Sequence, residues 1–169
     1  AFRFDTEMTA YFRALDNLLL ELREGKPIGT YPQQVRILST VRTMPAWLDV
    51  EISWEQAASD LDALLKILRQ IREVLRGLES MESEDAEDLL GTLAMFNQNL
   101  SEIREKVESL TMDPQSDQIY WVELDPLQGR LTLQIAPLHI GGLMEKYLWH
   151  EKASVILTSA TLTTHGEFD

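Results

Sequence analysis

The chain of 169 residues contains no cysteine, which excludes disulfides, thiolate metal sites and iron–sulfur ligands within it. It has no apolar run as long as a membrane span and no visible signal peptide, so we expect a cytoplasmic protein without a membrane partner. Basic residues are also scarce, with 15 Lys and Arg against 28 Asp and Glu and a formal charge of −13. Because affinity for nucleic acid comes largely from cations that neutralise phosphates, the chain alone is expected to bind DNA weakly.

The negative charge is unevenly distributed along the chain. Residues 1–50 carry six acids and six bases, whereas residues 51–113 carry fifteen acids against six bases. The near-neutral first third is therefore where we expect any contact with single-stranded DNA, because bases and aromatic residues occur there together. The candidate contact residues are Lys26, Tyr31, Arg36, Arg42 and Trp47.

The N-terminal third is predicted to be helical. Apolar residues recur at three- and four-residue steps through residues 6–24, with Asp5 or Thr6 as the expected cap. A shorter helix is predicted over residues 32–44, because a proline suits its first turn and another proline follows its end. Residues 44–52 are interpreted as a linker.

The clearest pattern is a pair of long amphipathic helices. Ser53 and Gln56 match a capping box, and the apolar period then continues for about seven turns. A second helix is predicted over residues 84–110. Helices of about 25 residues, each about 38 Å long, joined by a short linker are expected to pack as an antiparallel hairpin. Their leucine stripes are interpreted as packing surfaces, with a partner-binding face as the alternative.

The remainder of the chain is typical of strands. Residues 119–124 and 130–136 flank a loop in which Gly129 supplies a positive φ, as in a β-hairpin. Tyr120 and Trp121 in the first of these strands are interpreted as core or cross-strand partners rather than base-stacking residues. A short helix over residues 143–149 and a last strand over residues 153–158 follow.

These patterns predict an α+β fold, mainly α, with a long helical hairpin, N-terminal helices packed on it and a small C-terminal β-lobe. The expected division is a helical domain over residues 1–113 and a β-rich part over residues 114–169. The last strand has no neighbour in the sequence, and open strand edges favour pairing. We therefore expect residues 155–158 to join the local hairpin or to pair with a second copy, giving a homodimer.

The last sixteen residues, SVILTSATLTTHGEFD, place a β-branched apolar run before a turn rich in hydroxyl side chains. Together with the strands upstream, this segment resembles the SAT motif of the XPD/DinG family of ATP-dependent DNA helicases. The residues that match the motif itself are Thr158, Ser159, Ala160, Thr161 and Leu162.

The resemblance implies that the chain is a piece of a larger DNA helicase that unwinds 5′→3′, uses ATP and Mg²⁺, and acts in DNA repair. It further implies an arch-like role for the helical part, which guides or separates single-stranded DNA. The SAT motif couples the nucleotide site to the DNA site. The expected partners are single-stranded DNA and the other motor domains of the same polypeptide. Whether the parent carries an iron–sulfur cluster stays open.

Catalytic chemistry is not predicted for this piece. The phosphate-cradling pattern G-x-x-x-x-G-K-[ST] does not occur, and the three histidines do not form a metal-binding motif. We therefore expect that the chain alone contains no catalytic residues, no metal site and no cofactor, and that it does not hydrolyse ATP. The alternative function is an acidic helical scaffold or adaptor that binds a protein partner.

Overall fold

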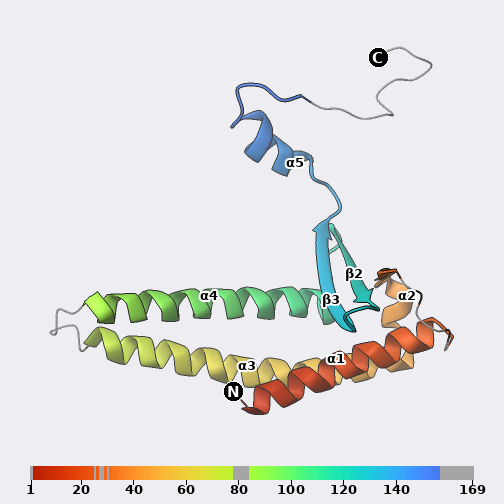
Figure 1. The fold of residues 1–169 in the computed structure, drawn as a ribbon, viewed down its shortest axis with the longest axis horizontal. Coiled ribbons are helices and arrows are strands. Elements are labelled where there is room, and N and C mark those ends of the chain that lie inside the picture. The colour runs from red at the N-terminus through yellow and green to blue at the C-terminus, as the bar shows by residue number, and fades with distance from the viewer. Residues whose placement is uncertain (1, 25, 27–28, 30, 78–83, 157–169) are drawn as a thin grey trace. The chain divides into compact units, whose positions relative to one another are not determined.

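The computed structural model describes residues 2–24, 26, 29, 31–77 and 84–156. The chain is mainly helical with one small antiparallel sheet, which confirms the predicted α+β class (Figure 1). It divides into two compact units, Ala1–Ala136 and Pro137–Asp169, which are described separately. The predicted boundary at residue 113 concerns the parent protein and stays a prediction.

The first helix, α1 (Phe2–Leu22), begins four residues before the predicted start. Asp5 therefore lies in its first turn, where a carboxylate is favoured by the helix dipole, and the predicted capping role of Asp5 or Thr6 is wrong. One face of the helix is buried in the core. This face comprises Tyr11, Ala14, Leu15, Leu18 and Leu19.

The helix predicted over residues 32–44 is wrong. The structure has a strand, β1 (Gln33–Arg36), followed by the single-turn helix α2 (Ser39–Arg42). Val35 pairs with Val122, and the Ile37 N–H donates to the carbonyl of Tyr120 at 2.9 Å. Pairing with a distant strand satisfies the backbone here, so tertiary context overrides the local helical spacing.

The linker predicted over residues 44–52 is also wrong, because α3 (Pro45–Gly77) runs through it. Proline suits the first helical position, where its missing N–H is not needed, so Pro45 begins this helix rather than ending the previous one. Trp47 and Val50 are buried and extend the apolar stripe. Ser53 is consequently a mid-helix residue and not a cap.

The second long helix, α4 (Glu84–Thr111), matches its predicted range. Hydrogen bonds between the two helices show that they are antiparallel, because partners further along α4 lie earlier in α3. Asn97 Nδ2 donates to the Leu65 carbonyl at 3.3 Å, and Arg104 Nε donates to Asp62 Oδ1 at 2.8 Å. The predicted antiparallel hairpin is confirmed (Figure 1). α1 packs on the N-terminal half of α3, which we call proximal, and Arg3 pairs there with Asp60 at 2.9 Å. The C-terminal half of α3 and the part of α4 beside it are called distal.

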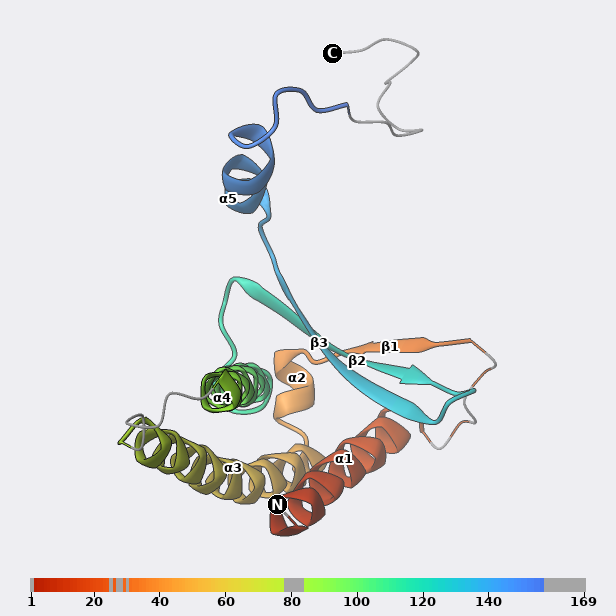
Figure 2. The same cartoon turned by 60° about the vertical axis from the view of Figure 1, so that its left-hand side comes forward.

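The strands β2 (Gln118–Asp125) and β3 (Arg130–Pro137) confirm the predicted hairpin. Asp125 Oδ1 accepts the N–H groups of Leu127 and Gln128, and Gly129 has φ 59°. The sheet order is β1-β2-β3. The predicted β-lobe is therefore not formed by C-terminal strands alone, because its third strand, β1, comes from the N-terminal third of the chain. Figure 2 shows the three strands together on one side of α1 and α2.

The core joins the helices of the first unit to the inner face of the sheet. Trp47 and Trp54 are its largest fully buried side chains, and the Tyr11 ring lies 5.6 Å from that of Trp54. The Tyr11 hydroxyl and Thr111 Oγ1 share a buried hydrogen bond of 2.8 Å. This bond ties the middle of α1 to the end of α4.

Alkaline pH is expected to weaken the fold through Tyr11. Burial raises the pKa of Tyr11, and its bond to Thr111 lowers it by less. The folded state therefore keeps the phenolic proton when the unfolded state has released it. Above about pH 10 this proton should make the free energy of unfolding fall by about 1.4 kcal/mol per pH unit. Urea unfolding from pH 8 to 11 should show this slope for the unsubstituted chain and for the exposed control Tyr31→Phe. It should become shallower in Tyr11→Phe, and an unchanged slope there would contradict the assignment.

The second unit contains α5 (Gly141–Met144), which continues into a π-helical turn at Glu145–Trp149. The short helix predicted over residues 143–149 is thus confirmed in position. The strand predicted over residues 153–158 is wrong for residues 153–156, which the structure describes outside any strand. Residues 157 and 158 lie outside the described part. None of the described helices is both long and apolar enough to span a bilayer.

Candidate functional site

Three of the five residues predicted to contact DNA are on the surface. Tyr31 is 80% exposed, and Arg36 is exposed at the end of the edge strand β1. Lys26 Nζ pairs with Glu24 Oε2 at 2.8 Å, and both side chains are about three-quarters exposed. These side chains can reach a phosphate or a base without any change in the fold, although the paired Glu24 reduces the attraction at Lys26.

Of the other two predicted contacts, Trp47 is a side chain of the core and Arg42 is half-buried beside it. The Arg42 guanidinium lies 4.9 Å from the ring centre of Trp47 and 5.4 Å from that of Tyr120, and its Nη1 donates to the Thr111 carbonyl at 3.1 Å. Burial lowers the pKa of Arg42, and the nearby Tyr120 and Glu51 oppose that shift. Trp47 is 1% exposed, so its ring has no free face for a base. DNA contact by the five residues stays a prediction.

The register of the sheet places Arg36 next to Trp121, a pair that no pattern in the sequence predicts. Arg36 is directly opposite Trp121, while the neighbouring pair Val35 and Val122 faces the core. Arg36 and Trp121 therefore share the outer face of the sheet, because successive side chains of a strand alternate between faces. Tyr120 is buried in the core, so the interpretation of both aromatics as core or cross-strand partners is confirmed.

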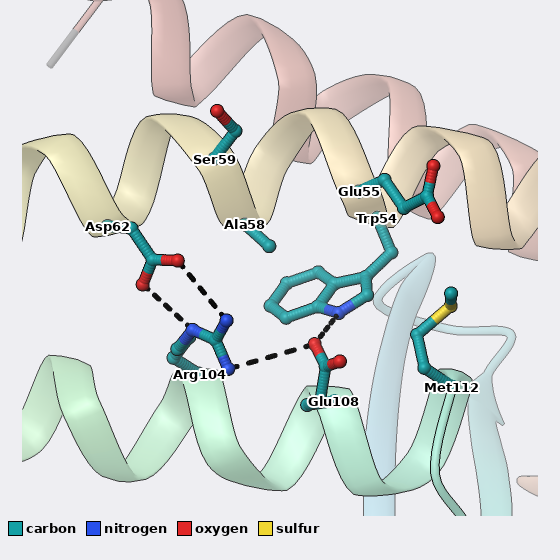
Figure 3. Close-up of a pocket in the computed structure, with 8 residues that line it drawn as sticks. All are labelled: Trp54, Glu55, Ala58, Ser59, Asp62, Arg104, Glu108 and Met112. Atoms are coloured by element: carbon teal, nitrogen blue, oxygen red, sulfur yellow. Dashed lines mark hydrogen bonds and ion pairs between the residues drawn. The ribbon is translucent and has the colours of Figure 1, made fainter.

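A cluster of charged side chains connects α3 to α4 in the middle of the hairpin. Arg104 Nε and Nη2 donate to the two carboxylate oxygens of Asp62 at 2.8 and 3.2 Å. The indole N–H of Trp54 donates to Glu108 Oε2 at 2.8 Å, and Arg104 Nη1 lies 3.8 Å from the same oxygen. Figure 3 shows these side chains pointing toward one another from the two helices. The hydrogen bond to Asp62 raises the pKa of Arg104.

This cluster borders a shallow cavity of about 360 Å³. Its lining residues are Trp54, Glu55, Ala58, Ser59, Asp62, Arg104, Glu108 and Met112 (Figure 3). Two of the acids, Asp62 and Glu108, are bonded to Arg104 and Trp54, and within the described residues no three His, Cys, Asp or Glu side chains are grouped to hold a metal. The arrangement can fasten two helices together, and the Ser59 hydroxyl in its lining has no histidine beside it that would activate it as a nucleophile.

Removing the Asp62 charge should cost little, because the side chains of Arg104 and Asp62 are 32% and 52% exposed and solvent screens the pair. We expect Asp62→Asn to lower the free energy of unfolding by roughly 0.5–1 kcal/mol at low ionic strength. The difference should shrink in 1 M NaCl, which screens exposed charges. Urea unfolding at both salt concentrations measures it, with the exposed Glu87→Gln as the matched control. A loss above about 2 kcal/mol, independent of salt, would show that the pair behaves as a buried one.

The predicted coupling motif, Thr158 to Leu162, lies outside the described residues, so its placement stays a prediction. The cluster of Asp62, Arg104 and Glu108 is not among the sites predicted from the sequence. Its local signal is the i, i+4 spacing of Arg104 and Glu108, but the cross-helix partner depends on how the hairpin is aligned.

The first unit is thus a helical hairpin whose two helices are joined by side-chain bonds and are packed against α1 and a small sheet. This architecture suits a structural or a binding role. In sequence, the chain is similar to the ATP-dependent DNA helicase DinG of Photobacterium profundum, with 33% identity over 132 residues. The aligned part is 74% of this chain and 19% of the relative, so the chain spans about a fifth of that helicase. The similarity supports a relationship to DinG-like helicases. No family model matches the chain, and no solved structure matches it significantly.

Proposed function

We propose that the chain is a part of a DinG/XPD-like ATP-dependent DNA helicase. In this proposal residues 1–113 form its arch-like region, and residues 114–169 belong to the first motor domain and end in the SAT motif. The observation that carries the proposal is the similarity to the DinG helicase over three-quarters of the chain. The TSATL sequence at residues 158–162 agrees with it.

The helical hairpin acts in this proposal as a stiff pillar that keeps separated DNA strands apart. The 33 residues of α3 correspond to a rod of about 50 Å, and the 28 residues of α4 to about 42 Å. Bonds at Asn97, Arg104 and Glu108 fasten α4 to α3, which favours rigidity. Because residues 51–113 carry a net charge of −9, the pillar guides DNA by exclusion rather than by adhesion.

The parent polypeptide supplies the chemistry. Phosphoryl transfer needs a phosphate cradle, a lysine, a Mg²⁺-holding acid and an arginine, and these belong to its other parts in this proposal. The hydroxyls of Thr158, Ser159 and Thr161 would change hydrogen-bond partners with the state of the nucleotide and pass that change to the DNA site. Single-stranded DNA reaches this chain at the exposed Lys26 and Arg36.

Assays on the full-length parent test the proposal. We expect it to hydrolyse ATP when single-stranded DNA is present and to separate duplexes that carry a 5′ single-stranded tail. Replacing Ser159 and Thr161 by Ala should retain ATP hydrolysis while strand separation falls strongly. Absence of DNA-stimulated hydrolysis in the unsubstituted parent overturns the proposal and leaves the acidic adaptor as the function. Light scattering of the present chain decides separately whether residues 155–158 pair two copies.

A further inference from the structure

One face of α4 carries an uninterrupted heptad pattern of large apolar residues. The residues alternate at four- and three-residue steps for three heptads, which is the spacing of the a and d positions in a coiled coil. We call this set the α4 seam. It comprises Leu89, Leu93, Phe96, Leu100, Ile103, Val107 and Leu110.

The α4 seam is distinct from the face that α4 turns toward α3. Asn97, Arg104 and Glu108 bond to α3, and each lies one residue beyond a seam position. One residue is about 100° of rotation around a helix, so the seam flanks the hairpin contact. The hairpin therefore covers the α4 seam only in part, and Leu93 and Leu100 are half-buried.

Within the described residues, only the C-terminal end of the α4 seam is fully buried, while Leu93 and Leu100 are half-buried. Val107 and Leu110 are 7% and 0% exposed, whereas Leu89, Phe96 and Ile103 are each about half exposed. Ile103 also lines an apolar groove of about 570 Å³, whose other walls include Met8 and Phe12 of α1 and strand β3. The covered end, the groove and the open stripe thus form one continuous surface.

The same change from covered to open occurs on α3. The ion pair between Arg3 and Asp60 marks the end of α1 on this helix, and the last buried apolar residue of α3 is Leu65. Beyond it, Ile67, Ile71 and Val74 are 50%, 44% and 64% exposed. Figure 1 shows α3 and α4 continuing side by side past the N-terminal end of α1. The distal hairpin is therefore a two-helix layer with apolar residues on both helices.

The composition of α4 excludes an ordinary solvated helix here. Residues 89–101 contain no charged side chain, although residues 84–88 before them include four acids. Exposed helices normally carry interspersed charges, and an apolar patch of this kind marks an interaction surface. An uncharged, heptad-spaced stripe is the surface that another amphipathic helix packs against.

We propose that an amphipathic helix from another part of the parent polypeptide packs along the open α4 seam and the exposed residues of α3. This proposal rests on the proposed function, because the chain spans about a fifth of the helicase it resembles and most of that polypeptide lies elsewhere. The helix extends the layer that α1 forms proximally and completes a three-helix bundle. From Leu89 to Ile103 the seam is about 21 Å long, which needs a helix of about fourteen residues.

The occupant is a helix of the same polypeptide rather than a second copy or DNA. Two copies would each bring a charge of −13, whereas a tethered segment has an effective concentration in the millimolar range. DNA needs several cations opposite its phosphates, whereas the α4 seam has none and Lys106 is the single cation in the lining of the adjoining groove.

Thiol labelling tests the proposal, because the present chain has no cysteine of its own. Phe96→Cys and Ile71→Cys probe the two open stripes, and the exposed Gln98→Cys, about 200° around α4 from Phe96, is the matched control. The rate of reaction with a maleimide is followed peptide by peptide in the present chain and in the full-length parent. We expect the two probes to react roughly tenfold or more slowly in the parent, and the control to react equally in both.

Equal rates for the probes in the two proteins overturn the proposal. Slow, concentration-dependent labelling of the present chain also overturns it, because it identifies a second copy as the occupant. DNA-stimulated ATP hydrolysis is measured on the Gln98→Cys parent, so that loss of the proposed function is detected independently of the labelling result. Circular dichroism of each variant confirms that the helices are intact.

Discussion

Trp54→Ala is expected to lower the free energy of unfolding by about 4 kcal/mol, the usual cost of removing a buried tryptophan ring. Trp54 is 1% exposed, and its ring packs 5.6 Å from the ring of Tyr11 on α1. Its indole N–H also donates to Glu108 on α4. A single side chain thus joins three helices, and its removal leaves both a cavity and a carboxylate without its donor. Single domains are stable by only about 5–15 kcal/mol, so this loss is a large fraction of the total.

Trp54→Phe separates the two contributions. It keeps a ring against Tyr11 but cannot donate to Glu108, so we expect a loss of about 2 kcal/mol, which combines the hydrogen bond to a charged acceptor with some lost volume. Urea unfolding followed by circular dichroism at 222 nm measures both variants. A loss below about 1 kcal/mol for Trp54→Ala would mean that the three helices do not depend on this ring.

Arg42→Ala is expected to destabilise the fold by about 2–3 kcal/mol, although arginine is usually a surface residue. The substitution removes contacts with the rings of Trp47 and Tyr120 and leaves the Thr111 carbonyl without its donor. Arg42→Lys should recover less than half of the loss, because an ammonium lacks the planar group that stacks between two rings.

Arg36→Ala is the matched control, since Arg36 is exposed on an edge strand and its loss should change stability by less than about 0.5 kcal/mol. Binding of a labelled oligothymidine to the parent at low salt adds a second readout. We expect Arg36→Ala to weaken binding and Arg42→Ala to leave it unchanged at temperatures where both proteins are folded. A reversed order, with a stable Arg42→Ala protein that no longer binds, would assign Arg42 to the DNA contact after all.

The difference between these two arginines illustrates what local sequence reasoning misses. Both occur in the near-neutral first third, close to aromatic residues, and no local pattern indicates that Arg42 is half-buried while Arg36 is exposed. The structure separates them because β1 pairs with β2, and Gln34 and Glu123 meet although they are 89 residues apart in the chain. That pairing brings Tyr120 over Arg42 and directs Arg36 to the outer face.

The heptad spacing of α4 illustrates the opposite case. The apolar period of both long helices is strong enough to predict the hairpin, because i, i+3 and i+4 neighbours interact within one helix and need no distant partner. The apolar period of α4 by itself favours internal packing for all seven residues of the α4 seam. That the distal part of the seam is open is known only from the structure, which shows how far α1 extends along α3.

The sequence by itself determined the two long helices, the β2–β3 hairpin with Gly129 in its loop, and the likeness to a DNA helicase. These features depend on local periodicity, on turn chemistry and on a short motif, and each of these signals involves residues that are close together in the sequence. Only the tertiary structure decided that residues 33–36 form a strand, that α3 begins at Pro45, that Trp47 is buried and that Arg42 is half-buried against it. Each of these outcomes depends on a partner far away in the chain, because burial and strand pairing are properties of the assembled core rather than of any segment.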